Sequence, residues 1–375
     1  MLRSTAPPGG VYEKKLVIGR VGGDKARAMD GTIYQFGGLP MVSGFGTAGP
    51  DHRARTVDDA TAPLLVGVIR NPRSHRNKGL VPELSDSPNV MTRTPRTRGA
   101  LVHDLAEFAA AGVGLLVVDG GDGTVRDVLT CGAMTFGDAW PQMAVLPKGK
   151  TNALAVDLGL PGNWGLQDAL AAQSAGQAII KRPLVVTAVD SPGDAQMMGF
   201  ILGAGIFTAA TDAGQVAHKF GAFNSVAVGV TAVAGIAQGL FGLGNGPWRR
   251  TTKMELELGE GRRPAPRCAY GKPGQRYAVL MSSLGHFPLG IRPFGSESRD
   301  INYLLVDEPL RRVVAITPLI LAGRDVTRFE HLGVHQGHAD SAMLTVDDTF
   351  ILDGEAFPKG RYRIALGPSL RFVTP

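Results

Sequence analysis

The sequence predicts an α/β domain followed by a mostly antiparallel β-sandwich domain. Between residues 63 and 182, apolar strand-like runs alternate with helical patterns, which is typical of a doubly wound parallel sheet. From residue 183 to 360, strand-like segments dominate and helical stretches are few. With 375 residues, 44% of them hydrophobic, the chain is long enough to bury two cores.

The first domain alternates predicted strands with predicted helices. Leu64–Arg70 is nearly all apolar, as expected of a parallel strand that is buried on both faces. Leu101, Leu105 and Phe108 recur at helical spacing, which predicts a helix over residues 98–111. In chain order, strands are expected at 64–70, 90–94, 115–119 and 143–146, and helices at 98–111, 125–129 and 153–158.

The second domain contains short strand-like segments with two helical insertions. The strands are expected at 184–189, 198–202, 254–258, 277–282, 301–306, 343–346 and 362–366, and the helical stretches at 208–240 and 310–321. We expect the tail, residues 361–375, to return to the first domain. Residues 1–62 are rich in Gly, Pro, Thr and charge, which predicts a poorly ordered or loosely packed leader.

Residues 220–248 contain no charged side chain. Their length would permit a membrane span. However, Val226, Val230 and Val233 recur at helical spacing and indicate one apolar face instead of an apolar cylinder. We therefore expect a helix that packs over an apolar pocket or lies in the membrane interface.

The composition predicts an anionic partner and a reducing compartment. The net charge is +6 and the sequence pI is about 9.4, but only 6% of residues are aromatic, so the stacking platforms of a nucleic-acid site are missing. Cys131 and Cys268 show no disulfide or metal spacing, and no secretory signal is visible, which favours the cytoplasm. The following basic residues predict a solvated face or a contact with an anionic membrane: Arg249, Arg250, Lys253, Arg262, Arg263 and Arg267.

The run from Leu115 to Thr124 is the strongest functional signal. An apolar strand ends in Gly120-Gly121-Asp122-Gly123, and a helix follows. Glycines let the backbone approach a phosphate, and a helix N-terminus adds N–H donors for the anion. Because a carboxylate would repel a bare phosphate, Asp122 indicates a Mg²⁺ ion or a hydroxyl to be activated. The run therefore predicts a nucleotide site.

Two further loops follow predicted strands of the same sheet, and ligands bind at that edge of open α/β sheets. These loops are Asn71-Pro72 and Gly149–Asn152. Together with the glycine run and the end of the strand over 90–94, they offer amide or hydroxyl groups suited to a nucleotide: Asn71, Thr94, Thr124, Thr151 and Asn152. In isolation, such residues are usually turn or cap residues. The chain contains neither a P-loop nor a G-x-G-x-x-G motif after a strand.

Asp353-Gly354-Glu355 places two carboxylates around a glycine after a predicted strand. The segment is either a tight turn or a source of a general base for a hydroxyl that accepts a phosphoryl group. His331, His335 and His338 have a spacing that could form a metal face on a helix. The glycines between them argue against a helix, so we expect surface or turn histidines.

Together these motifs resemble the diacylglycerol kinase-type lipid kinases, which include sphingosine and ceramide kinases and bacterial relatives. The resemblance runs from about Leu64 to the C-terminus. It implies an α/β nucleotide domain like that of NAD kinases and diacylglycerol kinases, a β-rich lipid domain, and chemistry on ATP and Mg²⁺ between them. The implied acceptor is the primary hydroxyl of diacylglycerol, ceramide or a sphingoid base. The implied location is the cytoplasm, at the inner face of the membrane.

The resemblance also assigns roles to residues. It implies that Gly120, Gly121, Gly123 and Thr124 cradle the phosphates, and that Asn71, Thr94, Gly149, Thr151 and Asn152 line the nucleotide. It implies that Asp122 positions Mg²⁺ or assists deprotonation, and that Asp353 and Glu355 are the candidate bases. From electrostatics we add that Lys148, with Lys150, neutralises phosphate charge.

Five features of this chain differ from the family pattern. His75 replaces a glycine, Lys150 a common threonine and Ala153 a frequent aspartate. Residues 300–304 lack the Asp-Gly-x-x-Asp pattern of a structural Mg²⁺ loop, and residues 199–205 lack the acidic residue that is frequent in sphingosine and ceramide kinases. Two alternatives stay open: a kinase for a soluble substrate such as NAD, disfavoured by the absence of an Asn-Glu dipeptide, and a non-catalytic lipid-binding relative.

Overall fold

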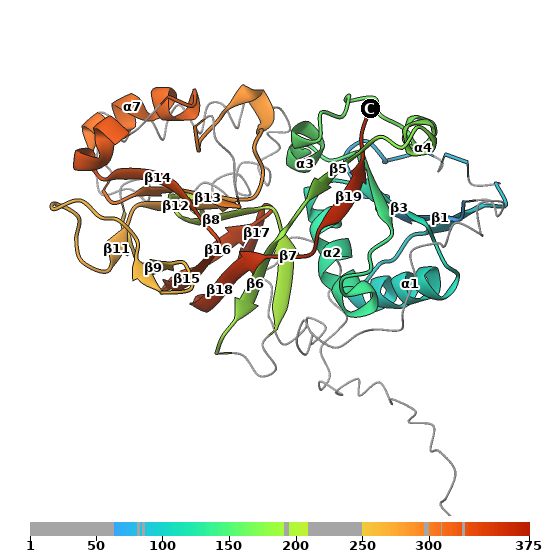
Figure 1. Ribbon diagram of the computed structural model, residues 1–375, viewed down its shortest axis with the longest axis horizontal. Helices are drawn as coiled ribbons and strands as arrows, with labels where there is room; N and C mark the ends of the chain where they lie inside the picture. Colours follow the sequence, from blue (N-terminus) through green and yellow to red (C-terminus); the bar gives the residue numbers. More distant parts are fainter. Residues whose placement is uncertain are drawn as a thin grey trace, which may run out of the picture.

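The computed structural model describes residues 64–80, 83–84, 87–190, 195–208, 250–295, 300–308, 310–324 and 327–375. They form two units side by side, one with a parallel sheet and one with antiparallel sheets (Figure 1). The predicted leader, the uncharged stretch 220–248 and Arg249 lie outside the described residues, as does nearly all of the predicted helix over 208–240.

The first unit is built on one sheet with the strand order β2-β1-β3-β4-β19-β5. All neighbours pair in parallel except β19 and β5, which are antiparallel. The strands are β1 (Val66–Arg70), β2 (Val90–Arg93), β3 (Leu115–Gly120), β4 (Gln142–Pro147), β5 (Ala178–Lys181) and β19 (Leu370–Val373). Because the chain passes from β1 to β2 on one side and then to β3 on the other, the strand order reverses between β1 and β3. Open α/β sheets bind ligands at such a switch point.

Four helices connect these strands: α1 (Arg98–Ala110), α2 (Asp122–Phe136), α3 (Ala153–Asp157) and α4 (Leu166–Ser174). In the view of Figure 1, α1 and α2 lie below the strands, and α3 and α4 lie above them. The Thr97 hydroxyl caps α1 by accepting a hydrogen bond of 3.1 Å from the Ala100 N–H. The predicted start of α2 was wrong: Gly121 is its N-cap, so Asp122 and Gly123 belong to its first turn.

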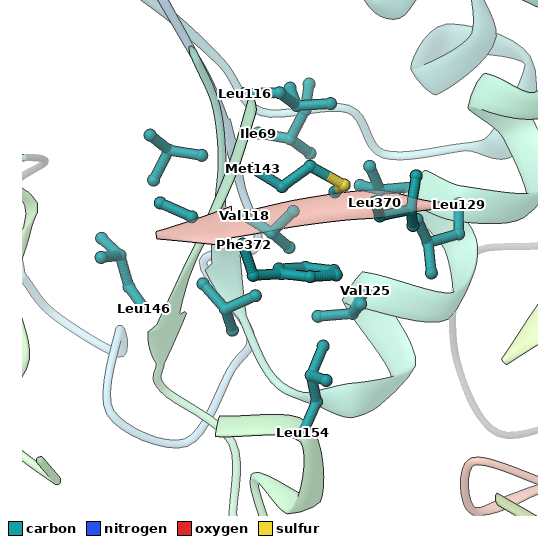
Figure 2. Close-up of a cluster of buried hydrophobic side chains, with 14 of the residues drawn as sticks. Ile69, Leu116, Val118, Val125, Leu129, Met143, Leu146, Leu154, Leu370 and Phe372 are labelled. Carbon is teal, nitrogen blue, oxygen red and sulfur yellow. The ribbon is translucent and has the colours of Figure 1, made fainter. Parts of the chain in front are cut away.

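The last strand completes the core of the first unit. Figure 2 shows Phe372 of β19 beside Val125 of α2 and Leu154 of α3. Phe372 is fully buried, so the C-terminal strand packs into a core formed by residues some 250 positions earlier in the chain. The extent predicted for this return was too long, since residues 362–366 pair with β6 in the second unit and only 370–373 join β4 and β5.

The described part of the second unit contains two antiparallel sheets. The first has the strand order β10-β9-β15-β18-β6-β7, and β11 also pairs with β9. The second has the order β14-β13-β12-β8-β16-β17. One apolar core takes residues from both, among them Leu344 and Ile364 from the first sheet and Leu202 and Val279 from the second. The two sheets therefore pack face to face. The predicted strand over 198–202 is divided at Phe200 into β7 and β8, which belong to different sheets.

The strands of the second unit have the following bounds: β6 (Leu184–Ala188), β7 (Gln196–Gly199), β8 (Ile201–Gly205), β9 (Thr252–Leu258), β10 (Arg263–Pro264), β11 (Gln275–Arg276), β12 (Ala278–Ser282), β13 (Ile301–Val306), β14 (Val334–Ala339), β15 (Ser341–Val346), β16 (Phe350–Leu352), β17 (Glu355–Phe357) and β18 (Gly360–Leu366). Its helices within the described residues are α7 (Arg311–Leu321) and the short 3₁₀ turns η4 (Pro288–Gly290) and η5 (Thr327–Leu332). Helix α7 covers the outer face of β13 and β14 through Val313 and Ile320. No helix in the described ranges is long and apolar enough to cross a bilayer.

Helix α2 is buried along nearly its whole length because it lies between the first sheet and β7. The Thr130 hydroxyl on α2 accepts a hydrogen bond of 3.0 Å from the Met198 N–H of β7. The helix that begins in the glycine motif is thus also the main contact between the two units.

Candidate active site

The loops that follow β1, β3 and β4 meet at the carboxyl edge of the first sheet. The Asn71 side-chain amide after β1 donates a hydrogen bond of 3.0 Å to the Thr124 hydroxyl in α2. The Asn71 N–H also donates to the Asp119 carbonyl at 3.0 Å, and the Lys148 N–H after β4 donates to the Gly120 carbonyl at 3.1 Å. These contacts bring the predicted nucleotide loops into one cluster.

Gly121 and Gly149 bring two of these loops into direct backbone contact. A Cβ atom built on Gly121 would lie 2.8 Å from the Gly149 Cα, and one built on Gly149 would lie 2.7 Å from the Gly121 Cα. Only glycine fits such an approach at both positions. At Gly123 the nearest atom to a built Cβ is 3.7 Å away, so the space there does not require glycine.

Asn152 has a structural role in the loop after β4, and its predicted contact with a nucleotide stays a prediction. It is the N-cap of α3 in the left-handed conformation, with φ 51°, and it is buried. Its side-chain oxygen accepts from the Gly149 N–H at 2.7 Å, and its side-chain nitrogen donates to the Gly149 carbonyl at 3.1 Å. Because both ends of the amide close this turn, Asn152 shapes the loop, and the expectation that it lines the nucleotide is not supported by its contacts.

Asp122 lies where the first turns of α2 and α3 come together. Its carboxylate accepts a hydrogen bond of 3.3 Å from the Leu154 N–H of α3. Burial raises the pKa of this carboxyl, although backbone N–H groups at the start of α3 oppose the shift. No side chain caps the N-terminus of α2, so the donors of its first turn suit an anion.

Asp353 reaches the same place from the second unit. It forms a two-residue hairpin turn with Gly354 between β16 and β17, and both have positive φ, 46° and 81°. Asp-Gly is typical of such turns. The Asp353 carboxylate accepts hydrogen bonds from the Phe200 and Ile201 N–H groups at 2.9–3.1 Å. The segment 199–205, which lacks an acidic residue of its own, thus receives one from the hairpin.

Asp122 and Asp353 line one cavity of about 350 Å³ between the two units. Burial and the neighbouring charge of Asp122 raise the pKa of Asp353 to about 7. Carboxylate oxygens are ligands for Mg²⁺, and one or two of them suit an ion whose other ligands are mainly substrate phosphates. The rest of the cavity is mostly apolar, and its other lining residues are Thr151, Ile201, Gly203, Phe207, Leu280, Ile351 and Gly354.

The raised pKa of Asp353 predicts a pH dependence of stability. Since the folded protein holds this proton more tightly than the unfolded chain, the stability it provides is present below pH 3.8 and is lost as the pH rises to about 7. Asp353→Asn should remove this slope, because Asn-Gly suits the same turn. Thermal unfolding of both proteins from pH 5 to 8 checks this: the variant should gain Tm relative to the parent as the pH rises, and parallel Tm curves would contradict it.

Glu355 does not line this cavity. Its carboxylate pairs with the Arg126 guanidinium and lies 3.9 Å from Arg98, and its side chain is 18% exposed. Burial raises the pKa of Glu355, and Arg126 opposes the shift. The structure therefore separates the two predicted bases: Asp353 lies at the cavity with Asp122, and Glu355 lies in an ion pair behind the hairpin.

Thr94 and Asn71 line a second cavity, of about 220 Å³, at the ends of β1 and β2. Arg73 and Arg96 line it as well, so it offers positive charge beside an amide and a hydroxyl. Lys148 is not brought to either cavity. Its ammonium lies 3.8 Å from the Glu83 carboxylate and faces a third, small pocket.

The sequence analysis missed the residues that support the loops. Asn77 is buried, and its side-chain amide donates to the Asn71 and Asp119 carbonyls at 3.0 and 3.1 Å. Arg126 is buried in α2, one turn after Asp122. The adjacent charges of Arg126 and Asp127, in a helix whose other residues after Asp122 are apolar or small, were a usable signal, because buried charges need partners.

The histidines lie apart from the site. His335 in β14 is buried, and its Nε2 lies 3.1 Å from the Asp307 carboxylate, which also pairs with Arg276. His338 pairs across from Asn302. Cys131 and Cys268 are both free cysteines. Among the described residues, no group of three or more His, Cys, Asp or Glu side chains is arranged to hold a metal ion.

Comparison with known proteins identifies the first unit. Residues 66–182 match the family described as the diacylglycerol kinase catalytic domain. Over these residues, which are less than half of the chain, the sequence is similar to this family. The matched diacylglycerol kinase catalytic domain spans β1 to β5 and includes every loop of the nucleotide cluster.

Curated relatives and solved structures extend this result. "Probable lipid kinase YegS" of Escherichia coli O127:H6 is 33% identical over 90 residues, which are 24% of this chain and 29% of that protein. Its Shigella flexneri counterpart is 32% identical over 90 residues, with the same coverage. The match thus spans less than a third of these relatives. A diacylglycerol kinase crystal structure from Bacillus anthracis Sterne superposes with a TM-score of 0.53 at 16% identity, covering 83% of this chain and 97% of that one. It shares the two-unit fold.

Proposed function

We propose that this protein is a lipid kinase that transfers the γ-phosphoryl group of ATP to a hydroxyl of a membrane lipid. The observation that carries the proposal is the cavity between the units. There Asp122 and Thr151, from the catalytic domain, face Asp353 and an apolar wall from the second unit. A phosphorylated donor and an apolar acceptor need such a boundary between polar loops and apolar side chains.

The donor nucleotide binds along the carboxyl edge of the first sheet. Its path begins at the cavity of Asn71 and Thr94, where Arg73 and Arg96 supply positive charge. It continues over the glycine motif, where the N-terminus of α2 suits the phosphates. It ends at Asp122. Asp122 holds the Mg²⁺ that accompanies ATP, since carboxylates and phosphates together satisfy this ion.

Asp353 is the residue that takes the proton of the acceptor hydroxyl. Its pKa of about 7 suits a general base near neutral pH. In the transfer, the hydroxyl oxygen forms a bond to the γ-phosphorus, the bond between the γ-phosphorus and the bridging oxygen of ADP breaks, and the proton moves to Asp353. Neutral donors from Phe200 and Ile201 hold the carboxylate in place.

The apolar wall favours a lipid acceptor over a soluble one. Ile201, Phe207, Leu280 and Ile351 would contact hydrocarbon, whereas a nucleotide such as NAD needs polar partners for its sugars. Diacylglycerol, ceramide and sphingoid bases all present a hydroxyl beside hydrocarbon chains. We propose this class as the substrate. The presence of both Asp122 and Asp353 in one cavity disfavours a non-catalytic lipid-binding protein.

The acceptor also implies contact with an anionic membrane surface. Arg250, Lys253, Arg262 and Arg263 are exposed near β9 and β10 at one edge of the second unit, with Arg267 partly buried nearby. Such basic clusters attract anionic lipids. We propose that the protein acts at the inner face of the membrane in the cytoplasm.

The test is phosphoryl transfer from radiolabelled ATP with Mg²⁺ to mixed micelles that contain diacylglycerol, ceramide or sphingosine, with NAD as a soluble acceptor. We expect labelled lipid with at least one of the three lipids, loss of product when the metal is chelated with EDTA, and no labelled NADP. Labelling of NAD alone would support a soluble-substrate kinase. Binding of ATP and lipid without any transfer would support a non-catalytic relative.

A further inference from the structure

A leucine at the tip of the loop after β12 projects completely into solvent. This loop, residues 283–295, contains η4 and leaves β12 beside Ile201, which lines the cavity between the units. Leu289 in η4 is 99% exposed, more than any other large apolar side chain of the described residues. A single exposed leucine is ordinary on a protein surface. This one differs in how the chain holds it.

Leu289 has a backbone conformation that disfavours leucine. Its φ is 62°, in the left-handed region, and Gly290 follows with φ 69°. Glycine would adopt this conformation at position 289 without strain, and the exposed leucine side chain gains no packing in return. Neither backbone preference nor packing within the chain accounts for the leucine, which indicates a contact outside the chain.

Both ends of the tip are fixed. Before it, the N–H groups of Gly285 and His286 donate to the Asp157 carboxylate of α3 at 2.8 and 2.7 Å. Phe287 is buried in the core of the first unit, and its ring lies edge-on to that of Phe294, with centroids 5.6 Å apart. The tip is therefore a pre-organised projection, which loses little conformational entropy when it binds.

Helix α7 extends this surface. The Arg292 N–H donates to the Leu321 carbonyl at 2.7 Å, so the end of α7 lies beside the loop. Leu319 at this end of α7 is 47% exposed, and Arg292 and Arg324 are exposed as well. In the view of Figure 1, α7 and α3 both lie above the sheets. Leu289, Leu319, Arg292 and Arg324 are called the docking surface below.

The charge of the docking surface is entirely positive along both chain segments that form it. Residues 284–295 contain one arginine, residues 310–324 contain three, and neither segment contains Asp or Glu. Exposed leucines beside arginines match an anionic bilayer, because the leucines enter the acyl region and the guanidinium groups meet the headgroup phosphates. A second protein chain would need about 800 Å² of closely packed surface on each partner, which a projecting tip suits poorly.

We propose that the protein docks on an anionic bilayer through this surface, with the Leu289 side chain in the acyl region. The inference rests on the proposed lipid kinase function for its purpose, since the loop begins at the wall of the cavity that takes the acceptor. Its test does not, because vesicle binding needs no ATP. The basic cluster near β9 and β10 supplies further charge to the same kind of contact.

The experiment measures binding of the full chain to vesicles of phosphatidylcholine, with and without phosphatidylglycerol, by flotation. The variants are Leu289→Gly and the double variant Arg292→Gln with Arg324→Gln. Phosphoryl transfer to a short-chain diacylglycerol in solution is compared with transfer to long-chain diacylglycerol in the vesicles. The soluble acceptor reports the chemistry without docking.

Two variants are matched controls. Leu80→Ala alters a leucine of the first unit that is 61% exposed, and it should bind vesicles as the parent does. Arg262→Gln with Arg263→Gln removes the same charge near β9 and β10. A larger loss of binding in this pair than in the Arg292 and Arg324 pair would overturn the choice of docking surface.

We expect Leu289→Gly to weaken binding to anionic vesicles by about 10- to 100-fold, the effect of no longer burying one leucine side chain. Its Tm should equal or exceed that of the parent, because glycine removes the strain of a positive φ. Loss of Arg292 and Arg324 should weaken binding to anionic vesicles about 30-fold and binding to neutral vesicles little. Transfer to the soluble acceptor should stay unchanged in Leu289→Gly, and transfer in vesicles should fall.

Equal vesicle binding by Leu289→Gly and the parent would overturn the inference. A lower Tm together with weaker binding would assign Leu289 a structural role and would also overturn it. If Leu289→Gly instead abolishes self-association in analytical ultracentrifugation and leaves vesicle binding unchanged, the surface joins two copies of the chain. Vesicle binding that depends on Leu289 without any lipid phosphorylation would support the docking surface and refute the kinase proposal. Phosphorylation of the soluble lipid by a parent that binds no vesicles would refute the docking surface alone.

Discussion

Asp122→Asn is expected to abolish phosphoryl transfer while the protein remains folded. Asp122 is the carboxylate of the first unit that faces the cavity, and asparagine can neither hold Mg²⁺ with a full charge nor attract a proton. We expect kcat to fall about 10³-fold. Stability should stay equal or rise, because burial disfavours the charged carboxyl and asparagine still accepts from the Leu154 N–H.

Transfer assays together with thermal unfolding check this result. Asp138→Asn is the matched control, since Asp138 is an exposed residue after the other end of the same helix. It should leave kcat and Tm unchanged. An active Asp122→Asn protein would remove Asp122 from the chemistry, and an inactive protein with a much lower Tm would assign it a structural role.

The second large effect is expected at the contact between two glycines. Gly121→Ala places a Cβ only 2.8 Å from the Gly149 Cα, so the loops after β3 and β4 must separate. Gly149→Ala meets the Gly121 Cα and the Asn152 side chain, both at 2.7 Å. Each variant should lose about 1–3 kcal/mol of stability. Each should also raise the KM for ATP, because the loops that bind the phosphates move apart.

Gly123→Ala tests whether the loss of stability comes from crowding at the loop contact or from the loss of any glycine of the motif. The nearest atom to its built Cβ is 3.7 Å away and it lies in the first turn of α2, where alanine favours the helix. Its Tm should equal or exceed that of the parent. Urea unfolding of the three variants measures this order. A Gly121→Ala protein as stable as Gly123→Ala would show that the two loops do not need their contact.

Much of the fold follows from local patterns in the sequence. The apolar run before Arg70 predicts β1 because a strand buried on both faces excludes polar side chains. The Asp353-Gly354 pair predicts its own hairpin, since these residues favour positive φ. The glycines after β3 predict a close backbone approach. Their partner, Gly149, could not be identified from the sequence, because no local pattern indicates which loop contacts the glycine motif.

The roles of the site residues depend on long-range contacts. Asn152 and Lys148 have the side chains of nucleotide ligands, yet the folded chain uses Asn152 to close a turn and places Lys148 beside Glu83. Asp353 and Glu355 are two residues apart and looked equivalent, but Asp353 lies in the positive-φ turn and Glu355 begins β17. The regular alternation of a strand therefore does not relate their side chains, and one lines the cavity while the other pairs with Arg126.

By itself, the sequence determined the two kinds of sheet, the glycine motif with Asp122, and the acidic hairpin, because each depends on backbone preferences and on the period of apolar residues. Only the tertiary structure decided that Asp122 shares a cavity with Asp353, that Glu355 is held by Arg126, and that β19 completes the first sheet. These features join segments about 230 residues apart, and the packing of α2 against β7 brings the two units together.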